Sequence, residues 1–206
     1  MAVMDLARAE QADLVGLLTT LTPAQWDAPS LCAGWRVRDV VAHLVSYDGV
    51  PGREIGRRLV RTRLSPNGAN DSGVADFTSR PSEELVDLLK GAEGTRGLPA
   101  QVAGWVVLTD TLIHHQDIRR PLGLPREIPA ERLRAALRFA TFAPPLRGFW
   151  HGRGVRVVAT DVEWTFGFGP EARGPGEAVL MTLAARRGAA SDLHGPGAAT
   201  LVRRFG

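Results

Sequence analysis

Apolar residues recur every three to four positions through most of the first 142 residues, which is the spacing of amphipathic helices. Thr22 followed by Pro23 adds a capped helical turn through Trp26. The segment 65–73 is rich in Pro, Asn, Gly and Ser and is expected to be a loop. The longer periodic stretches predict helices over 3–21, from 36 to about 63 with a break or kink at Pro51, and over 81–93, 99–120 and 128–142.

The pattern changes after Pro145. Residues 154–160 (GVRVVAT) alternate and are rich in β-branched side chains, which predicts a strand, and 162–168 (VEWTFGF) has the pattern of its hairpin partner. Gly174 and Pro175 then open a helix through Arg187, and 196–205 suit one last short helix. The chain is therefore predicted to be mostly α, with a helical bundle over 1–144 and a small α/β subdomain over 145–206.

Length and composition narrow the class of protein. A chain of 206 residues makes one domain, or one domain with a small appendage. Its single cysteine, Cys32, excludes an intramolecular disulfide framework and fits a reducing compartment. No apolar run approaches the roughly 18 residues of a membrane helix, and charged residues near the N-terminus do not suit a signal peptide. A cytoplasmic protein with no membrane partner is expected.

Charge is unevenly spread along the chain. Residues 1–118 carry 11 basic and 15 acidic side chains, a net −4, whereas residues 119–206 carry 14 and 7, a net +7. A basic C-terminal part is compatible with nucleic acid or an anionic small molecule as partner. No basic run is dense, however, so the pattern favours scattered, solvated arginines, and no nucleic-acid partner is expected.

Asp110 and His114 carry the most informative spacing. Four residues on a helix is just over one turn, so both side chains point the same way, and both fall on the apolar face. A carboxylate buried there needs a partner, which a metal ion can provide. His43, on an earlier helix of the bundle, is the best candidate for a third ligand. Two histidines and a carboxylate suit catalytic Zn²⁺ or a facial Fe²⁺ site, and the alternative is a hydrogen-bonded structural cluster.

Two segments of the sequence resemble a known family. The stretch LTPAQWDAPSLCAGWRVRDVVAHLV (Leu21–Val45) is similar to the N-terminal signature of the mycothiol-dependent maleylpyruvate isomerases, and DTLIHHQDIRRPLG (Asp110–Gly123) resembles their acid-x-x-x-His-x-x-Asp segment. The family belongs to the DinB-like metal-binding bundles. The resemblance implies an up-down-down-up four-helix bundle in which His43, Asp110 and His114 bind a divalent metal.

The resemblance also indicates which metal to expect, and one of the candidate ligands differs from the family pattern. Zinc is the metal of the isomerase itself and is therefore the metal expected for this chain, with nickel and iron as alternatives. Asp110 stands where the isomerase pattern has Glu, and this shorter side chain is expected to shift the metal or weaken its binding. His115 points about 100° away around the helix from His114 and is expected at the surface or in support of the ligands.

Other residues are assigned supporting roles. Asp117 is expected to accept a hydrogen bond from the ligand His114, with pairing to a nearby arginine as the alternative. Glu10 interrupts an apolar stripe, so it is expected to hydrogen-bond near the site or to reach a helix end. Cys32 is interpreted as a small buried thiol rather than a nucleophile.

The resemblance suggests a function and leaves an alternative open. It implies a metal-dependent S-transferase or isomerase, in which the metal activates a small thiol, mycothiol, as a thiolate that attacks a small electrophile. Arg173 is the candidate for binding a substrate anion, and Arg186 is a weaker one. The alternative is a metal-binding protein without catalysis, acting as a sensor or regulator. A monomer or a homodimer is compatible with the sequence.

Overall fold

The computed structural model describes residues 2–92, 100–144 and 146–205. Its contacts divide the chain into two compact units, Met1–Leu124 and Pro125–Gly206. Each unit is described separately below.

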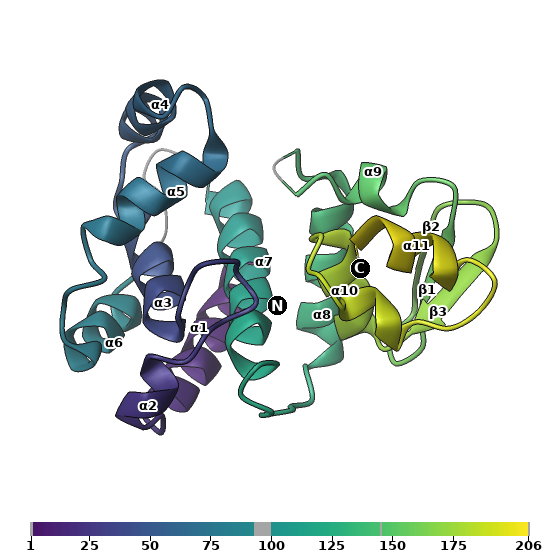
Figure 1. Ribbon diagram of the computed structural model, residues 1–206, viewed down its shortest axis with the longest axis horizontal. Coiled ribbons are helices and arrows are strands. Elements are labelled where there is room, and N and C mark those ends of the chain that lie inside the picture. Colours follow the sequence, from purple (N-terminus) through teal and green to yellow (C-terminus); the bar gives the residue numbers. More distant parts are fainter. Residues whose placement is uncertain (1, 93–99, 145, 206) are drawn as a thin grey trace. The chain divides into compact units, whose positions relative to one another are not determined.

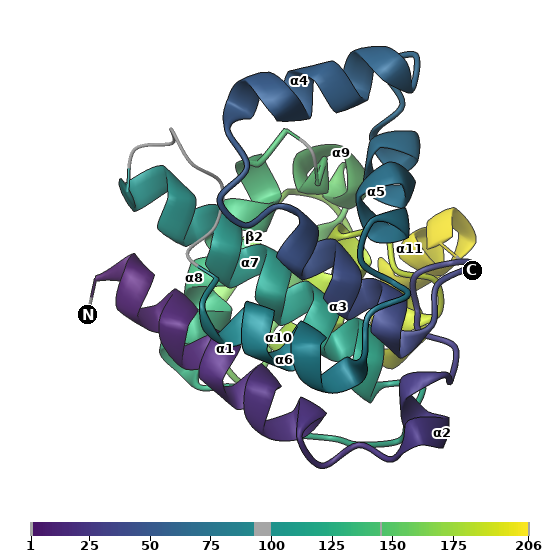
Figure 2. The same ribbon diagram turned by 90° about the vertical axis from the view of Figure 1, so that its left-hand side faces the viewer.

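Four helices form a bundle in the first unit: α1 (Val3–Leu18), α3 (Val37–Ser46), α6 (Ser82–Lys90) and α7 (Ala100–Arg119). Helix α1 packs on α7 and α6, and α3 packs on the same two helices from the other side (Figure 2). Aliphatic side chains from α1, α3 and α6 fill the centre, among them Leu14, Leu18, Val40, Val41, Leu85 and Leu89. Their burial provides most of the stability of this unit.

Helices α1 and α7 run in the same direction. Val3 lies against Gly104, where an added Cβ would come 2.8 Å from Val3 Cγ1, and further along both helices Glu10 lies against His115. Glycine at 104 therefore allows the two helices to approach closely at this end. The close packing of α1 on α7 fixes one side of the helix that carries Asp110 and His114.

Helices α3 and α6 run the other way. The backbone N–H of Leu31, just before α3, donates to the carbonyl of Asp117 near the end of α7, so α3 begins where α7 ends. Asp39, in the first turn of α3, accepts a hydrogen bond from Thr78, just before α6, so these two helices begin at the same end. The predicted four-helix bundle, with its up-down-down-up order, is confirmed.

Among the described residues, the first unit has three further helices: α2 (Pro23–Trp26), α4 (Gly52–Arg61) and α5 (Pro66–Ala75). The predicted break at Pro51 separates α3 from α4. The loop predicted over 65–73 is wrong, because these residues begin α5. The Ser65 hydroxyl accepts a hydrogen bond from the backbone N–H of Gly68 at 3.2 Å, and Pro66 occupies the first turn. A serine cap followed by proline thus starts a helix despite the loop-like composition.

The second unit contains a three-stranded mixed sheet (Figure 1). Strands β1 (Arg156–Ala159) and β2 (Trp164–Phe166) form the predicted antiparallel hairpin. Strand β3 (Glu171–Gly174), which the sequence pattern did not predict, pairs parallel with β1 on its other edge. Its sequence lacks β-branched residues, so the strand depends on backbone pairing and on the burial of Ala172.

Helices and a short turn complete the second unit: α8 (Ala130–Phe142), α9 (Gly148–Gly152), α10 (Gly176–Leu183), the 3₁₀ turn η1 (Ala189–Asp192) and α11 (Ala198–Phe205). Helix α8 packs on α10, so by its contacts it groups with the sheet, whereas the predicted domain boundary near residue 144 places it with the bundle. That domain division stays a prediction. The predicted boundaries at Glu93, Pro99 and residue 145 lie outside the described residues.

Among the residues that the structure describes, no helix combines the length and the apolar character needed to cross a membrane.

The start of α3 yields a pH-dependent prediction. Asp39 accepts hydrogen bonds from the backbone and side chain of Arg36, at 2.9 and 3.1 Å, and from Thr78. Burial opposes ionisation of Asp39, but these bonds outweigh it and lower its pKa below 3.8. Asp39→Ala is expected to lower the free energy of unfolding by about 1–2 kcal/mol at pH 7.

The direction of the pH dependence follows from linkage. Because the pKa of Asp39 is lower in the folded than in the unfolded state, its ionised carboxylate stabilises the fold above pH 3.8. This stabilisation is lost as the pH falls through the folded-state pKa. Urea unfolding between pH 7 and pH 3 should show the difference between wild type and Asp39→Ala shrinking. The exposed Asp87, paired with Lys90, provides the control, since Asp87→Ala should change little. A constant difference across this pH range would contradict the ionic contribution of Asp39.

Candidate metal centre

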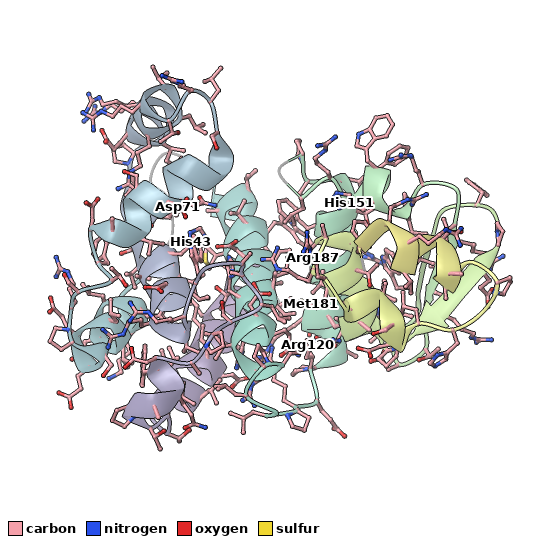
Figure 3. The ribbon with its side chains drawn as sticks, in the orientation of Figure 1. His43, Asp71, Arg120, His151, Met181 and Arg187 are labelled. Carbon is pink, nitrogen blue, oxygen red and sulfur yellow. The ribbon has the colours of Figure 1, made fainter. Side chains whose placement is uncertain are left out.

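Three side chains from two helices converge in the first unit. His43 lies on α3, and Asp110 and His114 lie one turn apart on α7; Figure 3 labels His43. His43 Nε2 lies 3.8 Å from Asp110 Oδ2, and His114 Nε2 lies 3.5 Å from Asp110 Oδ1. One ligand atom from each residue lies within 4.8 Å of the others. The structure thus brings together the three residues predicted as ligands.

These spacings fit a metal ion better than they fit direct hydrogen bonds. The 3.5 and 3.8 Å separations are too long for hydrogen bonds. Donors bound tetrahedrally at about 2.0–2.1 Å from zinc lie about 3.4 Å apart, which is close to both values. The histidine side chains are 7% exposed, whereas that of Asp110 is 43% exposed. A metal held here would therefore meet solvent on the Asp110 side and have room for a further ligand.

The second ring nitrogen of His114 is also engaged. His114 Nδ1 lies 2.9 Å from Oδ2 of Asp117, whose side chain is completely buried. The carboxylate can only accept, so Nδ1 carries a proton and Nε2 is directed at Asp110 and His43. A carboxylate bound to the far nitrogen of a ligand histidine fixes the ring and increases its basicity. Asp117 therefore lies where the sequence analysis placed it.

The electrostatics of the site favour a cation at His114. Burial by itself lowers the pKa of His114, but the charge of Asp110 and the hydrogen bonds to Asp117 and Cys32 outweigh it and raise the pKa to about 10. Two carboxylates thus create a negative potential around one imidazole. A second proton on the imidazole ring, or a metal ion in place of that proton, neutralises this potential.

Cys32 lies beside His114 and Asp117, a position that the sequence did not predict. Its Sγ lies 3.1 Å from Asp117 Oδ2 and 3.7 Å from His114 Nδ1. Cys32 and Asp117 are 85 positions apart in the sequence, so no local spacing could predict that they lie close together. Both residues lie in the two stretches that resemble the family. The up-down-down-up bundle that this resemblance implies was the signal from which their proximity could have been inferred.

Aromatic rings form the wall around His43. The ring centroids of Trp35 and Tyr47 lie 5.2 and 5.3 Å from that of His43. Helix α5 holds both rings, because Tyr47 Oη donates to Asn70 Oδ1 at 2.6 Å and Trp35 Nε1 donates to Asp71 Oδ1 at 3.0 Å. Figure 3 labels Asp71 on this helix. The segment predicted as a loop is thus a helix that supports the wall of the site.

Glu10 and His115 form a separate buried pair between α1 and α7. His115 Nδ1 lies 2.9 Å from Glu10 Oε1, and Arg119 Nε donates to His115 Nε2 at 2.8 Å. The surface position considered for His115 is wrong, since the residue is completely buried. Glu10 thus bonds to His115, which is not one of the three candidate ligands. The ring nitrogens of His115 are held by these two partners, which leaves His114 as the candidate ligand.

The two candidate arginines lie in the second unit. Arg173 is in β3 with its side chain 57% exposed, and its Nη1 lies 3.7 Å from Glu171 Oε1. Arg186 follows α10 and donates to the carbonyl of Ala184 at 3.1 Å. Their role toward a substrate anion stays a prediction.

Comparison with known families bears on the first unit. Residues 7–96 match the family model described as the mycothiol maleylpyruvate isomerase N-terminal domain. This segment belongs to that family of domains. It includes His43 and Cys32 and ends before α7, so the match covers one of the three candidate ligands and not Asp110 or His114.

Solved structures extend the comparison to the whole fold. The crystal structure of the mycothiol-dependent maleylpyruvate isomerase superposes with a TM-score of 0.64 at 16% identity, covering 95% of this chain and 92% of that one. A histidine-to-alanine mutant of the same enzyme gives the same TM-score and coverage at 15% identity. This likeness shows a shared fold. No curated protein matches the chain.

Two buried carboxylates on α1 and α7 give contrasting predictions. Asp117→Asn is expected to weaken Zn²⁺ binding by roughly 10–100-fold, because His114 loses its carboxylate partner. Glu10→Gln is expected to leave Zn²⁺ affinity within about twofold and to lower stability by about 1–3 kcal/mol, because Glu10 bonds to His115 instead. Competition with a chromogenic chelator and urea unfolding measure the two quantities. Equal losses of affinity in both variants would contradict this assignment of the two carboxylates.

Proposed function

We propose that the chain is a divalent-metal-dependent enzyme that uses a small thiol to modify or isomerise a small electrophile. The single observation that carries this proposal is the convergence of His43, Asp110 and His114 at metal-ligand spacing, with Asp110 open to solvent. Three protein ligands and an open side are typical of catalytic rather than structural metal sites. A divalent ion held there would lower the pKa of a thiol bound to it.

The residues of this chain would hold and orient the reacting groups. His43 and His114 provide neutral nitrogen ligands, and Asp117 holds the ring of His114 in place. The aromatic rings of Trp35 and Tyr47 lie beside His43 and would exclude water from that side. Arg173 remains the candidate for binding a carboxylate of the substrate.

The family match supports mycothiol as the thiol, since the matched domain and the similar structure are both described by it. Zinc is the first choice of metal because nitrogen and carboxylate donors at these spacings suit it, with nickel and iron as alternatives. The proposed protein is cytoplasmic, acts on small molecules as a monomer or homodimer, and needs neither nucleic acid nor membrane.

A metal-binding protein without catalysis is the second candidate. The observation that favours it is Cys32, which places a protein sulfur beside His114. A metal ion held by Cys32 at His114 Nδ1, rather than at Nε2, would have a protein thiolate as ligand in place of a substrate thiol. Sensing or regulation would then be the role of the bundle.

Metal analysis tests the central proposal. Protein purified without immobilised metal or chelator is expected to contain about one zinc, nickel or iron per chain, and the His43→Ala, His114→Ala double variant is expected to contain none. The exposed His194 in the second unit provides the matched control, since His194→Ala should keep its metal. Metal-loaded wild type is then expected to conjugate mycothiol to an aryl-halide electrophile, and the double variant is not.

A wild-type protein that neither contains metal nor binds added Zn²⁺ would contradict the proposal. His43, Asp110 and His114 would then be a hydrogen-bonded structural cluster. A metal-loaded protein that binds no thiol and conjugates none would favour the non-catalytic candidate.

A further inference from the structure

His114 presents two ring nitrogens, and each faces its own set of metal-ligating groups. Nε2 faces His43 and Asp110, whereas Nδ1 faces Cys32 Sγ at 3.7 Å and Asp117 Oδ2 at 2.9 Å. The third separation, from Sγ to Oδ2, is 3.1 Å. We propose that Cys32, His114 Nδ1 and Asp117 form a second metal position, which takes a thiophilic divalent ion such as Cd²⁺ or Zn²⁺.

The donor spacings of this second position suit a tetrahedral ion after a small adjustment. Zinc bonds of about 2.3 Å to sulfur and 2.0–2.1 Å to nitrogen and oxygen place the donors about 3.3–3.6 Å apart. The observed separations of 2.9, 3.1 and 3.7 Å differ from these values by a few tenths of an ångström. Hydrogen bonds from Cys32 and His114 to Asp117 account for the two shorter separations. Side-chain rotations alone can open such distances to those of a bound ion.

The loop before α3 holds Cys32 in place. Ser30 Oγ accepts from the backbone N–H of Cys32 at 3.1 Å and donates to the carbonyl of Trp35 at 2.8 Å. The N–H of Trp35 in turn donates to the carbonyl of Cys32 at 2.9 Å. Leu31 N–H fixes the loop to α7 at the carbonyl of Asp117, 3.0 Å away. The sulfur is thus preorganised beside the helix that carries its two partner ligands, which reduces the entropy lost on binding.

Charge balance favours an ion at this buried position. Binding displaces the thiol proton of Cys32 to solvent, and His114 binds as its other neutral tautomer, with its proton on Nε2 facing Asp110. The dication then meets one thiolate, one carboxylate and one neutral imidazole, which gives a centre with no net charge. Asp117 is completely buried, and a low-dielectric environment favours a neutral centre over an isolated charge.

The two positions compete for one imidazole. When Nε2 binds a metal, Nδ1 keeps its proton and donates to Asp117, so the second position is closed. The thiolate makes the second position the softer site and gives it a preference for thiophilic ions. An ion bound there withdraws His114 from the solvent-facing centre and would inhibit the chemistry proposed above. That last consequence rests on the proposed function, whereas the second position itself does not.

Cobalt absorption tests the second position directly. Cys32 is the only cysteine of the chain, so in thiol-free buffer an intense near-ultraviolet thiolate-to-Co²⁺ charge-transfer band reports that residue alone. His43→Ala disables the first position, and this variant is expected to bind one Co²⁺ with the band. The matched double variant His43→Ala, Cys32→Ser, which retains a side chain of similar size, is expected to lack it. Stoichiometric Co²⁺ binding by His43→Ala without the band would overturn the inference.

Alkylation of Cys32 gives a second readout in the wild-type chain. Added Cd²⁺ is expected to slow the reaction of Cys32 with iodoacetamide by about tenfold or more, because a metal-bound thiolate is a weaker nucleophile. His114→Ala should lose this protection. An alkylation rate that Cd²⁺ leaves unchanged in both wild type and His43→Ala would also overturn the inference.

The outcomes separate this inference from the proposed function. If wild type binds metal and conjugates thiol, and Cys32 gives neither the band nor protection, the inference fails and the proposed function stands. If Cys32 gives both signals and either the wild type conjugates no thiol or His43→Ala conjugates it at the wild-type rate, the second position stands and the proposed function fails.

Discussion

The need to satisfy polar groups buried along α7 is the constraint on which the rest of the first unit depends. Residues 111–118 are all buried, and they include His114, His115 and Asp117. Buried ionisable groups are costly unless each meets a partner. His115 pairs with Glu10 from α1, and His114 pairs with Asp117 on its own helix. His114 also faces Asp110 one turn away and the ring of His43 on α3. The negative potential left around His114 is what makes this point of the bundle suited to a cation.

The fold places these partners through backbone contacts distant from the site. Close approach of α1 and α7 at Gly104 aligns Glu10 with His115, so one of two adjacent histidines is taken up in holding the helices together. The bond from Leu31 to the carbonyl of Asp117 anchors the start of α3 and directs His43 and Cys32 toward α7. Helix α5 then supports Trp35 and Tyr47 beside His43. Scaffold and candidate centre are therefore specified by the same contacts.

Much of this arrangement is predictable from the sequence because helical periodicity and a one-turn spacing are local properties. Asp110 and His114 share a face for that reason, and the resemblance to a family added His43 and the helix order. Contacts across the fold are harder to predict: Cys32 beside Asp117 and Glu10 beside His115 join residues that no spacing connects. Strand β3 was missed because its pairing depends on backbone rather than side-chain preference. Helix α5 was missed because loop-like composition concealed a Ser65–Pro66 helix start.

The position of a bound ion tests the central claim most directly. Crystals grown with Zn²⁺ and measured on both sides of the zinc absorption edge locate the metal without assumptions about its ligands. The account predicts an anomalous peak in the first unit, about 2.0–2.2 Å from His43 Nε2, His114 Nε2 and a carboxylate oxygen of Asp110. A second peak beside Cys32 Sγ at partial occupancy would agree with competition for His114. Zinc-bound crystals with no peak between His43, Asp110 and His114 would contradict the account.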